Sequence, residues 1–302
     1  MRTPVPFDLD RVVRSHGWYD LPPWDWDARR GVLARPLLLS GGRVVRAEVA
    51  AASGGLALRV VANGRPNGAE VAEARSKMRA CLSLDEDLEP FRALVEELAS
   101  RPEAPALRRA LTRGAGRLLR SPTVFEDAVK TLCTTNCSWG LTRAMVGNLV
   151  AALGRAGPGG SRTFPSAEEM AGLPERFYRE RMRAGYRAPF LRALARGAAS
   201  GALDIESWRS PSIATEELAD RIRSLPGFGP YATEHLLRLL GRHRGLALDS
   251  FSRRKIARLR GRRRQPPDRA LARWFAPWGE WAGLAMWLEV TADWHGDAPT
   301  WP

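Results

Sequence analysis

The chain has 302 residues, and 44% of them are hydrophobic, which is enough for a substantial core and excludes a wholly disordered protein. Its 47 basic residues outnumber 33 acidic ones and give a formal net charge of +14 at pH 7. This balance favours an anionic partner, either nucleic acid or a membrane surface.

The cysteine and lysine contents add further limits. Three cysteines are too few for a disulfide framework or a four-cysteine metal or iron–sulfur site. Only Lys77, Lys130 and Lys255 are lysines, and the other basic residues are arginines. Arginine suits phosphate binding, but such a skew is equally typical of a GC-rich genome. No signal peptide and no apolar run of about 20 residues is apparent. We therefore expect a soluble, cytoplasmic protein with no membrane partner.

Residues 1–88 have the composition of a small β-rich domain. A short amphipathic segment precedes an aromatic cluster that contains Trp18 and Tyr19. Three runs with strand character follow, VLARPLLL, RVVRAEVAA and LALRVVAN, and they are separated by Ser-Gly-Gly turns. The pattern predicts a small antiparallel sheet in this domain.

The pattern is helical nearly throughout from about residue 69, so residues 89–302 are predicted to form a helical domain and the fold class is α+β, predominantly α. A polar turn that contains Asn136 interrupts the helical stretch SPTVFEDAVKTLCTTNCSWG. The asparagine can cap a helix or reach outward from a loop tip. Cys133 and Cys137 are predicted to share one helix face in the core. The C-terminal tryptophans are predicted to be core residues.

Residues 215–241 read as two short helices joined by a glycine hairpin. Apolar residues recur at helical spacing on both sides of Pro-Gly-Phe-Gly at 226–229, which breaks the pattern. Pro230 suits the first position of a new helix, and Gly241 suits its end. Backbone N–H groups in such a turn form an anion site suited to a phosphate. Taken alone, the segment is equally typical of an ordinary helical corner.

The order of these motifs is more specific than any one of them. LPGFG is followed by Asp249 twenty residues after Gly229, and the chain ends with a WxGLAMW segment. This arrangement resembles the helix-hairpin-helix (HhH-GPD) DNA glycosylases, most closely the branch with the alkylated-base (3-methyladenine) and 8-oxoguanine glycosylases. The resemblance covers nearly the whole chain and is strongest in its helical two-thirds. The hairpin alone also occurs in ligases, polymerases and nucleases.

The resemblance implies roles for the hairpin. The backbone amides around Gly227, Phe228 and Gly229 would hold a DNA phosphate. Carbonyl groups such as those of Leu225 and Phe228 would bind a monovalent cation, Na⁺ or K⁺. No other cofactor, and no iron–sulfur cluster, is expected.

The resemblance also assigns residues to the DNA and to the reaction. Asn136 matches the asparagine that some relatives insert into the duplex, and Thr135 and Tyr231 are placed with it at the DNA. Asp249 matches the essential carboxylate. Chemistry agrees, since cleavage of an N-glycosidic bond builds positive charge on the sugar, which a nearby carboxylate stabilises.

The target base must be extruded into a pocket that stacks on it and hydrogen-bonds to it. Tyr231, Trp18 and Tyr19 are the candidates for this pocket, although Trp18 and Tyr19 suit core packing equally well.

One departure from the family pattern concerns the reaction. Relatives that also cut the strand carry a lysine two residues after the second hairpin glycine, where this chain has Tyr231. A tyrosine cannot form a Schiff base with the sugar. We therefore expect a monofunctional glycosylase of base excision repair that releases a modified, preferably alkylated, base from duplex DNA and leaves an abasic site.

An oxidised or bulky modified base is the alternative substrate, and a non-catalytic module that binds damaged DNA is the alternative of another class. The protein is expected to be a monomer and to associate with the nucleoid through DNA.

Overall fold

The structure is a computed structural model that describes residues 1–295. Its sheet has four antiparallel strands in the order β1-β2-β3-β4. Their bounds are β1 (Asp25–Asp27), β2 (Val32–Leu38), β3 (Val44–Ala52) and β4 (Gly55–Val61). The three predicted strand runs correspond to β2, β3 and β4. The short strand β1 was not predicted, because three residues, two of them aspartate, carry no strand signal of their own.

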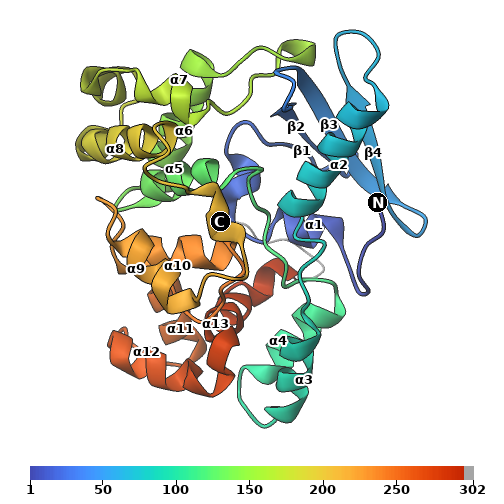
Figure 1. The fold of residues 1–302 in the computed structure, drawn as a ribbon. Coiled ribbons are helices and arrows are strands. Elements are labelled where there is room, and N and C mark those ends of the chain that lie inside the picture. The colour runs from blue at the N-terminus through green and yellow to red at the C-terminus, as the bar shows by residue number, and fades with distance from the viewer. Residues whose placement is uncertain (296–302) are drawn as a thin grey trace.

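Helices make up most of the remaining chain (Figure 1). Their bounds are α1 (Leu9–Val13), α2 (Gly68–Cys81), α3 (Glu89–Glu97), α4 (Ala104–Thr112), α5 (Val124–Thr134), α6 (Trp139–Leu153), α7 (Ala167–Ala171), α8 (Ala188–Ala199), α9 (Thr215–Arg223), α10 (Pro230–Leu239), α11 (Ser250–Leu259), α12 (Asp268–Phe275) and α13 (Ala282–Val290). Short helical turns include η1 (Gly17–Asp20), η4 (Gly185–Arg187) and η7 (Ala292–His295). The predicted fold class, α+β with helices predominant, is confirmed.

Buried side chains form two hydrophobic clusters. The first joins residues 9–84, which include the sheet and α2, to residues 118–240. The second joins α3 and α4 to α11, α12 and α13. The sheet therefore shares a core with most of the helices. This division by packing differs from the predicted domain boundary at residue 88, because residues on both sides of that boundary belong to the first cluster. That boundary stays a prediction, and residues 296–302 of the predicted helical domain lie outside the described part.

Most details predicted for the core agree with the packing. Trp278 is fully buried, and Trp274, Trp281 and Trp287 pack against the second cluster. Cys137 is an exception, because α5 ends at Thr134 and places it in the turn beyond the helix, half-buried. No helix in residues 1–295 combines the length and hydropathy needed to span a bilayer.

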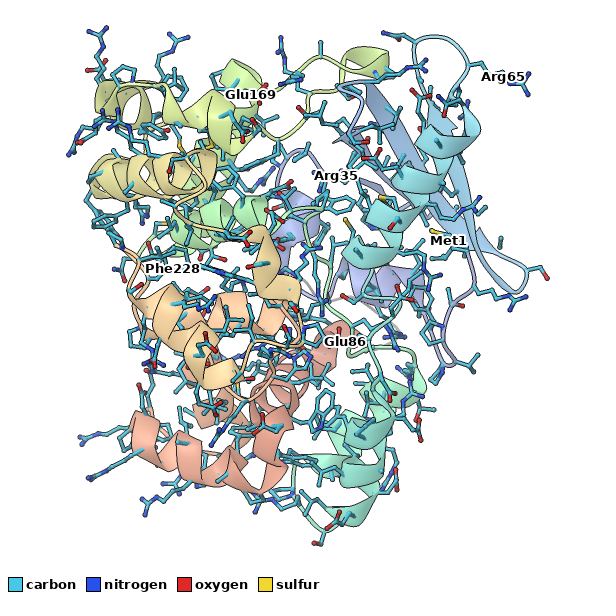
Figure 2. The ribbon with its side chains drawn as sticks, in the orientation of Figure 1. Met1, Arg35, Arg65, Glu86, Glu169 and Phe228 are labelled. Carbon is cyan, nitrogen blue, oxygen red and sulfur yellow. The ribbon has the colours of Figure 1, made fainter. Side chains whose placement is uncertain are left out.

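Two polar contacts connect the clusters. Glu86 is labelled in Figure 2. Its carboxylate accepts a hydrogen bond from Arg120 at 2.6 Å and contacts the His243 ring. Burial alone would raise the pKa of Glu86, but the charges of Arg120 and His243 lower it to about 2. Trp287 Nε1 donates to the carbonyl oxygen of Ser15 at 2.8 Å. The Trp287 contact fixes α13 against the loop that follows α1.

A buried ion-pair cluster lies beneath the sheet. Arg35 on β2 contacts Glu126 on α5 with Nη2 at 2.9 Å from Oε2, and Lys130 contacts the same carboxylate with Nζ at 2.6 Å from Oε1. All three side chains are at most 3% exposed. The Arg35 guanidinium also lies 4.5 Å from the centre of the Trp24 ring. One carboxylate therefore compensates two buried cations that hold the sheet on α5.

Candidate functional site

The predicted hairpin is present and connects α9 to α10. Gly227 has φ +88°, a conformation that favours glycine. A Cβ atom there would lie 2.7 Å from Phe190 Cδ2 and 2.9 Å from Leu132 Cδ2. Backbone conformation and close packing therefore both require glycine at this turn. The hairpin rests directly on α5 and α8.

The hairpin presents backbone groups rather than side chains. Phe228, which is labelled in Figure 2, is buried. Its N–H donates to the Leu225 carbonyl at 3.2 Å. In the part of the chain that the structure describes, the N–H groups of Gly227 and Gly229 have no acceptor. Gly229 is the N-cap of α10, so its N–H lies at the positive end of a helix. These two N–H groups are therefore the hydrogen-bond donors that the hairpin can offer to the predicted phosphate.

The predicted cation ligands are partly engaged. The Leu225 carbonyl accepts from Phe228 N–H, and the Phe228 carbonyl accepts from Thr233 Oγ1 at 3.5 Å. A carbonyl oxygen has a second lone pair, so both oxygens retain the chemistry that a Na⁺ or K⁺ ion needs. The cation site stays a prediction.

Asp249 begins helix α11. Its Oδ1 accepts the Ser252 N–H at 2.7 Å, and Ser252 Oγ accepts the Asp249 N–H at 3.0 Å, so the two residues form a capping box. The positive end of α11 stabilises the carboxylate. Within residues 1–295 no hydrogen bond to Oδ2 is present. Asp249 therefore has one oxygen fixed by the backbone and one available for a substrate.

Asn136 lies at the tip of the turn between α5 and α6. It is exposed, with φ +46°, a conformation that asparagine tolerates better than most residues. The turn is held from η4: Arg187 Nε donates to Thr135 Oγ1 at 3.2 Å, and Tyr186 Oη donates to the Thr135 carbonyl at 3.3 Å. Asn136 Nδ2 lies 3.4 Å from the same Tyr186 oxygen. Tyr186 and Arg187 therefore position the turn.

A cleft of about 1090 Å³ brings most of the predicted residues together. We call it the Asp249 cleft. It is lined by Thr134, Thr135, Asn136, Cys137, Tyr186, Arg223, Leu225, Gly227, Phe228, Gly229, Pro230, Tyr231, Ala232, Leu248, Asp249, Ser250 and Arg253. Burial raises the pKa of Tyr231 to about 12, while a hydrogen bond with Thr134 opposes the rise. The phenol at the cleft wall is therefore protonated at neutral pH and can donate a hydrogen bond.

Two predicted pocket residues lie elsewhere. Trp18 is 1% exposed, and its Nε1 donates to Asp127 at 2.8 Å inside the first cluster. Tyr19 lines a separate cavity of about 530 Å³ with Trp24 and Trp26. Neither residue lines the Asp249 cleft, and Trp18 takes the core position that the sequence also allowed, so their part in a base pocket stays a prediction.

Two histidines beside Trp18 were missed by the sequence analysis. The His16 ring centre lies 4.8 Å from that of Trp18, and the His235 ring centre lies 5.1 Å from it. His235 also stacks on Tyr231, with ring centres 5.8 Å apart and an interplanar angle of 17°. The sequence signal was present for one of them, since Tyr231 and His235 are four residues apart on α10 and share a face.

We expect the stability of the fold to decrease between pH 7 and pH 5 because His16 is buried. Burial lowers the pKa of His16 from 6.5 to about 3, so the unfolded chain binds a proton in this range that the folded chain does not. Stability is present above pH 6.5 and is lost as the pH falls, by about 2 kcal/mol at pH 5 for this residue. Urea unfolding at the two pH values measures the loss. The variant His16→Gln should lose less, and an equal loss would contradict the assignment.

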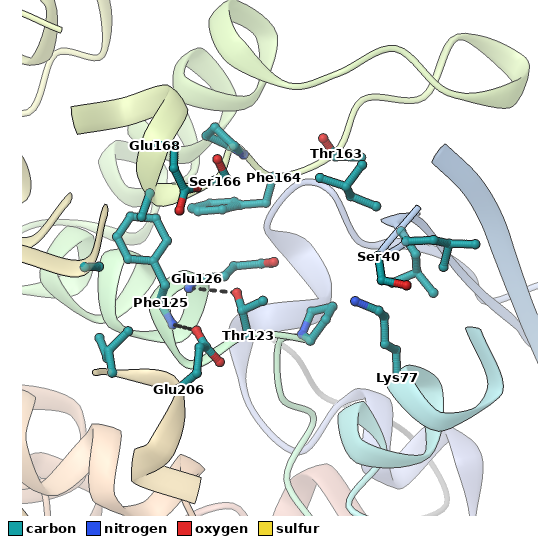
Figure 3. A pocket seen from close by; sticks show the side chains of 18 of the residues that line it. Ser40, Lys77, Thr123, Phe125, Glu126, Thr163, Phe164, Ser166, Glu168 and Glu206 are labelled. Atoms are coloured by element: carbon teal, nitrogen blue, oxygen red, sulfur yellow. Dashed lines mark hydrogen bonds between the residues drawn. The ribbon is translucent and has the colours of Figure 1, made fainter. Parts of the chain in front are cut away.

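A further cavity of about 710 Å³ lies between the sheet, α2 and the N-terminus of α5 (Figure 3). Its polar groups pair with one another. The Glu206 carboxylate accepts the N–H groups of Val124 and Phe125 at 2.9 and 3.0 Å, and Lys77 pairs with Glu73 at 3.3 Å. None of the predicted site residues lines this cavity.

The structure has the fold of solved DNA glycosylases of the helix-hairpin-helix class, as the order of motifs predicted. No model of a protein family matches the sequence, and no curated protein matches it.

Three solved structures illustrate the likeness. A 3-methyladenine DNA glycosylase from Archaeoglobus fulgidus has a TM-score of 0.75 at 18% identity, over 97% of each chain. The 8-oxoguanine glycosylase/lyase of Clostridium acetobutylicum has a TM-score of 0.71 at 16% identity, over 94% of this chain and 92% of the other. The 3-methyladenine DNA glycosylase Mag1 of Schizosaccharomyces pombe, in complex with abasic DNA, has a TM-score of 0.53 at 17% identity, over 67% and 96%.

Proposed function

We propose that the protein is a monofunctional DNA glycosylase of base excision repair. It extrudes a modified base from duplex DNA and hydrolyses the N-glycosidic bond with the help of Asp249. The observation that carries the proposal is the Asp249 cleft. There a carboxylate with one available oxygen lies in the same hollow as the free hairpin amides and the exposed Asn136 turn. The solved structures of the same fold, among them glycosylases in complex with DNA, support it.

The cleft residues divide into those that bind DNA and one that acts on the sugar. The N–H groups of Gly227 and Gly229 hold a phosphate at the start of α10. Asn136 occupies the space that the extruded nucleotide leaves in the duplex, on a turn braced by Tyr186. The free oxygen of Asp249 stabilises the positive charge that grows on the sugar as the bond to the base breaks, and it orients the attacking water.

The positions of the lysine side chains and of the N-terminal amino group support hydrolysis without strand cleavage. None of the three lysines lines the Asp249 cleft. Each is paired with a carboxylate, at 2.6 Å for Lys130 and Lys255 and at 3.3 Å for Lys77. The amino group of Met1 donates to the Leu56 carbonyl on β4. A Schiff base with the sugar needs a free amine at the cleft, and Tyr231 supplies none.

The partner we propose is double-stranded DNA with a single modified base, bound by a monomer in the cytoplasm. An alkylated base is the substrate that the sequence favours. Because binding relies on phosphate contacts, affinity should decrease as the salt concentration rises. An affinity that does not change with salt would argue against DNA as the partner.

We expect the protein to release free base from modified duplex DNA without forming a covalent intermediate. Mass spectrometry of bases released from DNA with alkylated, oxidised or deaminated bases tests the first part. Borohydride reduction during the reaction tests the second, and no enzyme–DNA adduct should appear. A trapped adduct would show a lyase. Binding to every lesion with no base released would instead show a non-catalytic module that recognises damaged DNA.

A further inference from the structure

We propose that the exposed arginines of α11, of α12 and of the loop between them bind the phosphates of duplex DNA on one side of the modified nucleotide. We call this set the α11–α12 arginine surface, and its members are Arg254, Arg258, Arg262–Arg264, Arg269 and Arg273. The inference rests on the proposed function, because DNA is the partner. It adds a second place, outside the Asp249 cleft, where the protein holds that partner.

More than half of the net charge of the protein comes from this short stretch of the chain. Residues 250–275 contain ten basic residues and one acidic residue, whereas the whole chain has 47 and 33. The stretch therefore contributes +9 of the formal net charge of +14. A GC-rich genome raises the arginine content of the whole chain, and that does not account for an excess of positive charge in one segment. The concentration favours a surface that meets an anionic partner.

Neighbouring carboxylates compensate only the other three basic residues of this stretch. Those pairs are Arg253–Asp268, Lys255–Asp293 and Arg260–Glu289. Within residues 1–295, no arginine of the α11–α12 arginine surface pairs with a carboxylate, and every one of them is exposed. Their positive charge is therefore left for a partner outside the chain.

The helical spacing places these arginines on outward faces. Arg254 and Arg258 are four residues apart on α11, and Arg269 and Arg273 are four residues apart on α12, so each pair lies on one face of its helix. Apolar residues of both helices are buried in the second hydrophobic cluster. Figure 2 shows side chains that end in nitrogen projecting outward from α12. The two helices thus pack inward through apolar residues and present arginine to solvent.

The α11–α12 arginine surface begins next to the Asp249 cleft. Arg253 lines the cleft, and its 2.8 Å pair with Asp268 joins the first turn of α11 to the first residue of α12. Arg254 and Arg269 are the next residues on the two helices. The ten residues of α11 extend about 15 Å. Duplex DNA carries one charge per about 1.7 Å of its axis, so the surface can face several phosphates beyond the cleft.

An anionic membrane is the other partner that such charge could attract. Helices that lie on a membrane expose a broad apolar face beside their basic residues. In residues 250–275, Leu259 is the one large apolar side chain that is exposed. Guanidinium groups bind phosphate oxygens in a bidentate manner. The small apolar area and the continuity with the Asp249 cleft therefore favour DNA.

The test compares two duplexes of equal length that carry a stable abasic-site analogue near one end. The long flank is 5′ of the analogue in one duplex and 3′ of it in the other. The triple variant Arg254→Gln/Arg258→Gln/Arg269→Gln should weaken binding of one duplex fivefold or more and of the other less than twofold, because the surface lies on one side of the cleft. For the affected duplex, the slope of log affinity against log salt concentration should become shallower by about 2–3.

A matched variant removes the same charge elsewhere. Arg2→Gln/Arg65→Gln/Arg75→Gln changes three exposed arginines at the sheet and α2, and Arg65 is labelled in Figure 2 at the opposite end of the molecule from α12. It should change the affinity for either duplex less than twofold. Equal effects of the two triple variants, or equal weakening of both duplexes by the first, would overturn the inference, because only total charge would then matter.

Two further measurements complete the test. Lysine at 254, 258 and 269 keeps the charge and should keep the affinity of the wild type for both duplexes. Vesicles of phosphatidylglycerol and phosphatidylcholine test the membrane. If the glutamine variant loses binding to these vesicles while its affinity for both duplexes is unchanged, the surface serves a membrane and the inference is wrong.

The duplex comparison needs no base release, so it is separable from the proposed function. A wild type that releases no base from any modified DNA, while the glutamine variant shows the one-sided loss of affinity, would refute the proposed function and support the surface. A wild type that releases base, while the glutamine variant binds both duplexes as the wild type does, would refute the surface alone.

Discussion

Replacing Asp249 with asparagine should lower the rate of base release on the order of 10³-fold while leaving the fold intact. The loss reflects the missing charge opposite the sugar, and groups aimed at developing charge contribute on this scale. Asparagine is as good an N-cap as aspartate, so its side-chain oxygen can still accept the Ser252 N–H at the start of α11. Single-turnover release from a substrate duplex measures the rate, and thermal unfolding verifies the cap.

Two controls make this result specific. Asp249→Asn should bind abasic-site DNA within a few-fold of the wild type, because Gly227, Gly229 and Asn136 are untouched. Asp268→Asn is the matched control variant. Asp268 pairs with Arg253 at 2.8 Å. Arg253 lines the Asp249 cleft, but Asp268 does not. It should retain base release. A reaction that survives Asp249→Asn would show that another group carries the chemistry, and Glu234 on α10 would be tested next.

The hairpin and its aspartate could be predicted because their signals are local. A Pro-Gly-Phe-Gly break between two periodic apolar stretches specifies α9, the turn and α10 within a short stretch of chain. Asp249 was assigned from the resemblance, and the structure places it as the N-cap of α11. The reason why Gly227 must be glycine was only half visible. Its positive φ follows from the turn, but its contact with Phe190 depends on α8.

The surroundings of Trp18 could not be predicted in the same way. Trp18 looked like a pocket residue because it is a large aromatic side chain near the start of the chain. Its burial depends on Asp127, 109 residues further on, and on the η1 turn. His16 and His235 are 219 positions apart, and no local pattern connects them. Tyr186 likewise gains its role only because η4 lies against the turn at Thr135.

Charge content was informative about the partner but not about which charges are buried. Lys130 looks in the sequence like any lysine on an amphipathic helix. In the structure it is fully buried, and burial lowers its pKa while the charge of Glu126 opposes that shift. Arg35 lies in the middle of an apolar strand run, and it is the second buried cation that pairs with Glu126. The sequence could not place three charges from β2 and α5 in one core.

This buried cluster should make Glu126→Gln one of the most destabilising single substitutions in the protein. The change is nearly isosteric, so it removes charge rather than volume, and it leaves Arg35 and Lys130 buried without a counter-ion. Breaking a buried pair by removing one partner costs about 3–5 kcal/mol. Urea denaturation should show the loss as a lower midpoint with an unchanged slope. Glu96→Gln, which removes an exposed partner of Arg108, should leave the midpoint unchanged.

A second substitution separates charge from packing in the same cluster. Lys130→Met keeps the length of the side chain and removes one of the two cations that Glu126 compensates. In the Glu126→Gln background it should recover part of the lost stability, because one unpaired buried charge is then left instead of two. The coupling energy from this double-mutant cycle measures the interaction directly. Additive losses would mean that water reaches the cluster in solution.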